Sequence, residues 1–159
     1  MNKISSQDYC KNFVRENNYN LYLLHFFVPR VNRRNILALM ALHTELRMIP
    51  KKVHDPMMRI IRLKWWEDEI EKIQNKKPYS DSPILQELAL NTIEWEEYFI
   101  RLDQSLRGED SDVDEYFYKI MFSTLPNQHS QKKFTKKLVL HDQLSDNTGF
   151  RAVRLWLGI

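Results

Sequence analysis

Glycine is unusually scarce in this chain. Only 3 glycines, Gly108, Gly149 and Gly158, occur among 159 residues, where average usage would place roughly 11. A phosphate-binding loop or a dinucleotide fingerprint requires clustered glycines, because only a residue without Cβ lets the backbone turn tightly against a phosphate. Hairpin-rich β folds also use glycine-containing turns. The shortage therefore favours helices joined by short connections and excludes the glycine-loop nucleotide-binding classes.

Charge, length and cysteine content restrict the class of protein and its expected compartment. The 24 Lys and Arg residues nearly balance 21 Asp and Glu residues, which gives a net charge of +3 and no indication of a nucleic-acid partner. The length predicts a single domain over residues 1–159. The lone Cys10 has no second thiol, and the N-terminus lacks an apolar signal core, so we expect a cytoplasmic protein. No stretch approaches the roughly 18 apolar residues of a transmembrane segment.

Apolar spacing and helix-boundary residues predict an all-α domain of about six to eight helices. One or two short helices are expected in residues 8–27, interrupted around Asn17 and Asn18. The segment 32–49 is apolar on nearly every side, which is typical of a central helix surrounded by neighbours. Asp55 and Pro56 predict the start of the next helix, with an apolar stripe along residues 56–75. Further helical runs open at residues 82 and 111.

Three groups of residues suggest a binding site. The five histidines lack the spacing of a zinc site, and His43 is predicted to be a hydrogen-bonded core residue. Asp110 and Asp114 have the i,i+4 spacing of a magnesium clamp, but acids at the start of a helix also stabilise its dipole, and we favour that second interpretation. The lysines of 131–137 could bind RNA or acidic lipid, but such a run is more typical of a solvated helix face, and we favour this interpretation.

Ordered motifs run through residues 8–73. They include Val14-Arg15-Glu16-Asn17, Phe27-Val28-Pro29 followed by Arg33, the run from Ala38 to Leu46, and Ile61-Arg62-Leu63-Lys64-Trp65-Trp66. In order and spacing these motifs resemble the squalene/phytoene synthase family of helical head-to-head prenyltransferases. The resemblance is closest to a bacterial and mitochondrial branch of the family without established carotenoid chemistry.

A second, shorter segment at 149–157 is similar to the arginine-rich Leu-Trp ending of many family members. The resemblance implies an isoprenoid-synthase-like helical bundle. Because the chain is much shorter than a typical member, it also implies that the bundle is incomplete, with several helices missing between the two segments.

The acids of the family's metal site are absent from the matching positions. In active members, a DD-x-x-D motif on the helix that corresponds to 32–49 holds the magnesium ions that bind the substrate diphosphate. Alignment without gaps from Pro29 and Arg33 puts Arg47, Met48 and Lys51 in place of the three acids. The second aspartate-rich motif of the family has no clear counterpart. The resemblance therefore implies a catalytically degenerate centre that holds no metal.

Contacts with a substrate would fall, by resemblance, on Arg33, Glu45, Arg47 and Lys51. Arg47 and Lys51 are cations that attract a diphosphate directly but cannot coordinate Mg²⁺ as carboxylates do. Glu45 is predicted to be a partly buried carboxylate paired with Arg33 or Arg62.

Three functional hypotheses follow. The first is a degenerate family member with a binding or respiratory-complex assembly role, because by resemblance its branch includes a complex I assembly factor. The second is a reduced Mg²⁺-dependent prenyltransferase that acts on isoprenoid diphosphates and uses Asp110, Asp112 and Asp114 as its metal clamp. The third is a decaying gene product without function. Loss of helices from the bundle also predicts exposed apolar faces on 32–49 and 56–75, and hence a protein partner or self-association.

Overall fold

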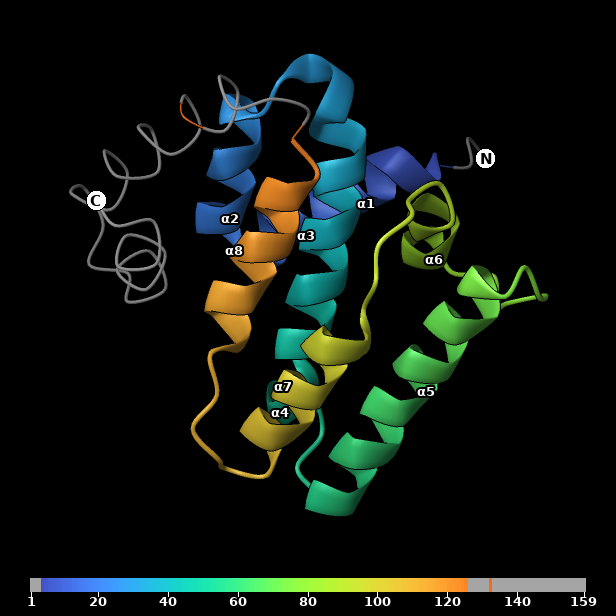
Figure 1. The fold of residues 1–159 in the computed structure, drawn as a ribbon, viewed down its shortest axis with the longest axis vertical. Helices are drawn as coiled ribbons and strands as arrows, with labels where there is room; N and C mark the ends of the chain where they lie inside the picture. Colours follow the sequence, from blue (N-terminus) through green and yellow to red (C-terminus); the bar gives the residue numbers. More distant parts are fainter. Residues whose placement is uncertain (1–3, 126–131, 133–159) are drawn as a thin grey trace.

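The computed structural model describes residues 4–125 and residue 132, and every regular element in this part of the chain is a helix (Figure 1). The predicted all-α fold is thus confirmed. The α-helices are α1 (Ser6–Asn17), α2 (Tyr19–Leu24), α3 (Arg33–Arg47), α4 (Ile49–Lys52), α5 (Pro56–Gln74), α6 (Pro83–Leu88), α7 (Glu96–Leu106) and α8 (Val113–Ser123). Two 3₁₀ turns, η1 (His25–Phe27) and η2 (Arg30–Asn32), connect α2 to α3.

The predicted break between the first two helices is present at Asn18. This residue ends α1 and caps α2, where its side-chain oxygen accepts a hydrogen bond from the backbone N–H of Leu21 at 3.1 Å. Asparagine favours such positions because its short side chain competes for backbone hydrogen bonds. The capping residue therefore turns the chain between two short helices.

Helix α3 forms the centre of the molecule, as the sequence predicts. Every residue from Ile36 to Leu46 is buried, and α3 packs against α1, α6 and α8. Figure 1 shows α3 between α8 on one side and α5 on the other. The expectation that the apolar face of 32–49 is exposed is wrong, because these neighbouring helices cover it.

Helix α5 begins where its sequence predicts. The Asp55 carboxylate accepts a hydrogen bond from the Met58 N–H at 2.9 Å, and Pro56 occupies the first turn, where a missing N–H costs nothing. Leu63, Trp66 and Ile70 are buried, and α5 packs mainly against α7. The other side of its first turns carries exposed apolar side chains, so the expected exposure of this helix is confirmed in part.

The helical run that the sequence predicts to open at residue 82 is followed by a second helix after a break. Helix α6 ends at Leu88, and α7 starts at Glu96. Between them the Asn91 side chain donates to the Glu87 carbonyl oxygen at 3.2 Å, which caps the end of α6. Apolar spacing continues across the break without glycine or proline, so nothing in the local sequence marks it.

Two sequence predictions lie outside the described residues. They are the family-like ending at 149–157 and the basic run at 131–137, of which only Lys132 is described, as an exposed residue. Among the described helices, none combines the length and the apolar character needed to cross a bilayer.

Candidate functional site

A buried polar cluster joins α3, α7 and α8 near the end of α3. The His43 Nδ1 atom lies 2.8 Å from the Tyr98 hydroxyl, and the Nε2 atom lies 3.2 Å from the Asp114 carboxylate. Phe117 stacks on the imidazole ring with 4.0 Å between the ring centroids. His43 and Tyr98 are buried, whereas the Asp114 side chain is 40% exposed. The prediction that His43 is a hydrogen-bonded core residue is confirmed.

Burial determines the protonation states of the side chains in this cluster. Desolvation lowers the pKa of His43, although its hydrogen bond to Asp114 acts in the opposite direction. Burial also raises the pKa of Tyr98, so its hydroxyl stays neutral and can donate to His43 Nδ1. The neutral imidazole then donates its Nε2 proton to Asp114. Burial raises the pKa of Asp114, but the hydrogen bond from His43 and the positive charge of Arg47 outweigh it, so the net shift is downward.

This protonation state predicts a pH-dependent stability. The pKa of His43 in the folded state lies below the unfolded value of about 6.5, so in acid the unfolded chain binds more protons than the folded chain. The contribution of His43 to the free energy of unfolding is therefore fully present above about pH 6.5 and is lost as the pH falls below this value. Each such histidine contributes at most about 1.4 kcal/mol per pH unit. His25, also buried and with a pKa lowered by burial, adds a similar contribution. We expect His43→Gln to have a shallower dependence of unfolding free energy on pH between about pH 5 and 7.

Urea unfolding at several pH values measures this slope. His54→Gln is the matched control, because His54 is exposed. A His43→Gln slope equal to that of the unsubstituted chain and of the control would disprove the proposed neutral state of His43.

Arg47 extends the cluster toward solvent. Its Nε atom lies 3.3 Å from the same Asp114 oxygen that faces His43, and its Nη1 atom lies 3.4 Å from the Ser105 hydroxyl. By the resemblance described above, Arg47 corresponds to the first acid of the family's metal motif. At this position a guanidinium therefore contacts the Asp114 carboxylate of α8.

The acids of the weaker magnesium hypothesis are separated in the structure. Helix α8 begins at Val113, so Asp110 lies in the preceding loop and is exposed, and does not share a helical face with Asp114. Asp112 forms an ion pair with Arg101. Among the described residues, no group of three or more His, Cys, Asp or Glu side chains is arranged to hold a metal ion. The donor set here therefore does not fit Mg²⁺.

The four candidate substrate-binding residues do not converge. Arg33 begins α3 and Arg47 ends it, which separates them by about 21 Å along the helix axis. Arg33 donates to the carbonyl oxygens of Val28 and Phe26 at 3.0 Å each, and Lys51 is exposed on α4.

Glu45 is buried, as expected, but its partner differs from the predicted one. Its carboxylate pairs with Lys52 at 2.7 Å, not with Arg33 or Arg62. The short helix α4 turns Lys52 back toward α3, whereas Arg33 lies at the far end of α3 and Arg62 lies over the Trp65 ring.

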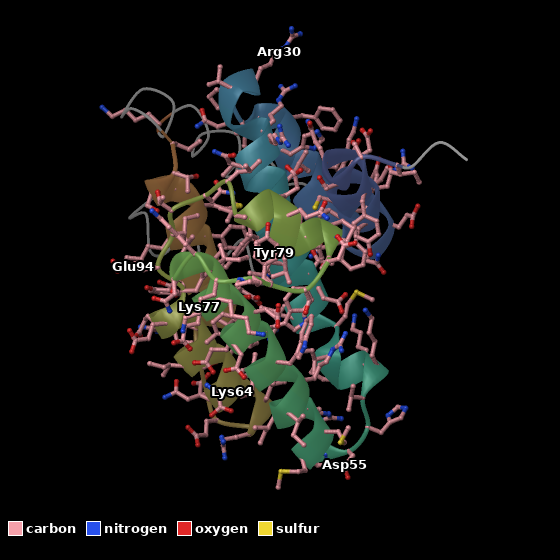
Figure 2. The ribbon with its side chains drawn as sticks, turned by 90° about the vertical axis from the view of Figure 1, so that its right-hand side faces the viewer. Arg30, Asp55, Lys64, Lys77, Tyr79 and Glu94 are labelled. Atoms are coloured by element: carbon pink, nitrogen blue, oxygen red, sulfur yellow. The ribbon has the colours of Figure 1, made fainter. Side chains whose placement is uncertain are left out.

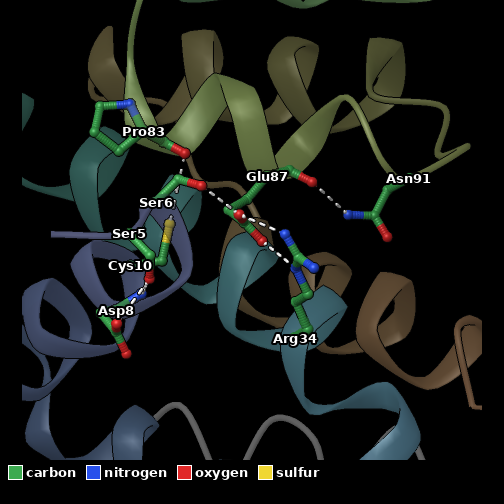
Figure 3. Close-up of polar contacts among 8 residues, drawn as sticks. All are labelled: Ser5, Ser6, Asp8, Cys10, Arg34, Pro83, Glu87 and Asn91. Carbon is green, nitrogen blue, oxygen red and sulfur yellow. Dashed lines mark hydrogen bonds and ion pairs between the residues drawn. The ribbon is translucent and has the colours of Figure 1, made fainter. Parts of the chain in front are cut away.

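A second buried carboxylate joins the N-terminal helices (Figure 3). Glu87 of α6 is 2% exposed, and it accepts hydrogen bonds from the Ser6 hydroxyl at 2.6 Å and from Arg34 Nε at 2.8 Å. The hydrogen bond from Arg34 holds the pKa of Glu87 below its ordinary value, against the effect of burial. This contact connects α1, α3 and α6 and has a structural role.

Sequence reasoning missed Tyr98 and Glu87 as members of polar clusters. Tyr98 carries no local sign of a partner in its helix. Glu87 does carry one, because it sits among Ile84, Leu85 and Leu88 in a short helix where every other inward position is apolar. A charge at such a position indicates a buried partner elsewhere in the chain.

Open grooves lie away from these clusters. One of about 430 Å³ runs between α5 and α7, and its lining includes the apolar Leu63, Phe99 and Ile100 and the charged Lys64, Asp103 and Arg107. Another of about 630 Å³ lies between residues 90–94 and α8. The first offers apolar surface with charges of both signs, a composition suited to a protein surface.

Comparison with known families gives a match over residues 14–107, more than half of the chain, to the family described as squalene/phytoene synthase. The matched segment contains α2 to α7 and the C-terminal part of α1. No solved structure matches the chain.

The curated relatives of the chain are named as assembly factors and not as synthases. The chain is 28% identical over 82 residues to human "NADH dehydrogenase (ubiquinone) complex I, assembly factor 6", which covers 52% of this chain and 23% of that protein. It is 33% identical over 85 residues to the Drosophila melanogaster homolog of that factor, which covers 50% of this chain and 25% of that protein. The matching segment thus spans about a quarter of the length of these relatives.

Proposed function

The chain belongs to the squalene/phytoene synthase family, and from this premise we propose that it is a catalytically degenerate member that acts by binding a protein partner in the assembly of a respiratory complex. The contact between Arg47 and Asp114 carries this proposal. It puts a guanidinium where the family pattern has a metal-binding acid, and it uses the Asp114 carboxylate for an ion pair.

The remaining electrostatics support a binding role over catalysis. A diphosphate carries several negative charges and is bound in the family pattern through carboxylate-held magnesium. Here Asp112 and Asp114 each pair with arginine or histidine, and the candidate contacts Arg33 and Lys51 lie on different parts of the fold. Reaching an isoprenoid diphosphate would require breaking these ion pairs first.

The relatives of the chain indicate which kind of protein partner it would bind. The names of these relatives describe assembly of NADH dehydrogenase complex I, and we extend that role to this chain. Its partner would then be a subunit or an intermediate of the complex. The groove between α5 and α7 is the proposed contact, because Ile100 exposes 47% of its area there and charged residues of both signs also line the groove. A reducing compartment accords with the buried, unreactive Cys10, whose pKa burial raises to about 12.

Deletion of the gene in the source organism tests the proposal. We expect a loss of assembled complex I on native gels, and recovery when the unsubstituted gene is returned. Ile100→Glu places a charge in the groove and should fail to restore assembly, whereas Ile4→Glu, at an exposed isoleucine outside the groove, should restore it. Unchanged complex I after deletion would refute the assembly role and favour a gene product without this function.

A further inference from the structure

One end of the molecule carries exposed apolar side chains. Figure 2 shows Asp55 at one extremity of the long axis and Arg30 at the other. Just after Asp55, the first two turns of α5 expose Met57 by 65%, Met58 by 52% and Ile61 by 53%. Spacing of three and four residues puts Ile61 beside both methionines on the helix surface. Together these three residues form a single apolar stripe, which we call the α5 tip.

Cations are concentrated in the sequence on both sides of the α5 tip. Residues 51–64 contain five cations, Lys51, Lys52, Arg59, Arg62 and Lys64, and a single acid, Asp55. Acids elsewhere in the fold pair with two of these cations, because Lys52 contacts Glu45, and Lys64 contacts Glu67 and Asp68.

The other cations meet uncharged groups or solvent. Arg59 donates to the carbonyl oxygens of Val53 and Pro50, and Arg62 lies over the Trp65 ring. Lys51 is exposed. Their positive charges are therefore available to an anionic surface.

Charge is unevenly distributed along α5. Arg59 and Arg62 lie in its first half, whereas Glu67, Asp68 and Glu69 lie beyond its middle. The part of the helix that carries the exposed methionines is therefore its cationic part, and the acids lie further along the helix.

We propose that the α5 tip is a peripheral membrane-binding surface that inserts Met57, Met58 and Ile61 among the headgroups of an anionic bilayer. Apolar side chains ringed by lysine and arginine are the combination that interfacial binding uses, since burial and attraction to acidic lipid add together. Trp65, half-buried one turn after Ile61, would lie at the level of the headgroups.

Shape favours a bilayer over a protein at this position. The α5 tip directly follows Asp55, which lies at the end of the long axis (Figure 2). The neighbouring groove is lined by Ile60, Leu63 and Lys64 together with residues of α7, and its lining does not include Met57, Met58 or Ile61. The inference does not depend on the proposed assembly role.

Vesicle sedimentation tests the apolar part of the proposal. The full chain is mixed with vesicles of phosphatidylcholine, and with vesicles that contain about 30% phosphatidylglycerol as the anionic lipid. We expect preferential binding to the anionic vesicles that weakens as salt is added. The double variant Met57→Gln/Met58→Gln should lower the partition coefficient at least about tenfold. Val31→Gln/Leu90→Gln, which removes two exposed apolar residues elsewhere, should leave it unchanged.

A second pair of variants tests the contribution of positive charge to vesicle binding. Lys51→Gln/Arg62→Gln should lower binding to anionic vesicles about tenfold or more, whereas Arg30→Gln/Lys77→Gln removes the same charge elsewhere and should change it much less. Circular dichroism confirms that each variant remains folded. The absence of binding to either vesicle, equal binding to both, or equal losses in tip and control variants would overturn the proposal. Loss of a protein contact in the tip variants with vesicle binding unchanged would also overturn it, in favour of a protein interface.

Discussion

Phe117→Ala is expected to lower the free energy of unfolding by about 3–5 kcal/mol, the largest single effect that the structure predicts. Phe117 is completely buried in α8 and stacks on His43. Its ring also lies 6.4 Å from the Tyr98 ring, measured between centroids. Removal of the ring leaves a cavity between α3, α7 and α8, and the loss combines the transfer free energy of the ring with the cost of that cavity.

Urea denaturation followed by circular dichroism measures this change. Phe26→Ala is the matched control, because Phe26 is 49% exposed, and it should cost less than about 1 kcal/mol. If Phe117→Ala cost no more than the control, α8 would not be packed on α3, and the cluster around His43 would not exist as described.

Glu87→Ala should have the next largest effect, a loss of about 2 kcal/mol. Two groups, the Ser6 hydroxyl and the Arg34 guanidinium, donate to this carboxylate. Hydrogen bonds to a charged group contribute more than neutral ones, but Arg34 is half exposed, so solvent screening reduces its share. The substitution removes the contact that connects α1, α3 and α6.

The pH dependence of this loss identifies its cause. The pKa of Glu87 is lowered in the folded state, so its stabilising contribution is present above the unfolded value of about 4.3 and disappears as the pH falls through the lower folded value. The difference between Glu87→Ala and the unsubstituted chain should therefore shrink in acid. Glu94→Ala, at an exposed glutamate, is the control. A loss that stays constant from neutral pH into acid would show that packing alone, and not the ion pair, is responsible.

Local chemistry made much of the fold predictable. Asp55 and Pro56 marked the start of α5 because capping depends on residues within one turn. The central position of α3 was predictable from its nearly continuous apolar run. The break between α6 and α7 was not predictable, because apolar spacing continued and no glycine or proline interrupted it.

The candidate site was harder to predict because it depends on contacts between distant residues. Asp114 could be placed at a helix start, where the structure finds it. Its contact with His43 joins residues far apart in sequence and depends on how α8 packs against α3. Glu45 illustrates the same limit, since its burial was expected, but its partner Lys52 follows from the turn into α4.

The central claim is that the metal-dependent chemistry of the family has been lost and a binding scaffold retained. Calorimetric titration of the chain with farnesyl diphosphate, with and without Mg²⁺, tests it most directly when product analysis accompanies it. We predict that Mg²⁺ does not strengthen binding and that no head-to-head product forms. Mg²⁺-dependent binding that disappears in Asp110→Asn/Asp114→Asn, or turnover to a head-to-head product, would contradict the account and establish a reduced prenyltransferase instead.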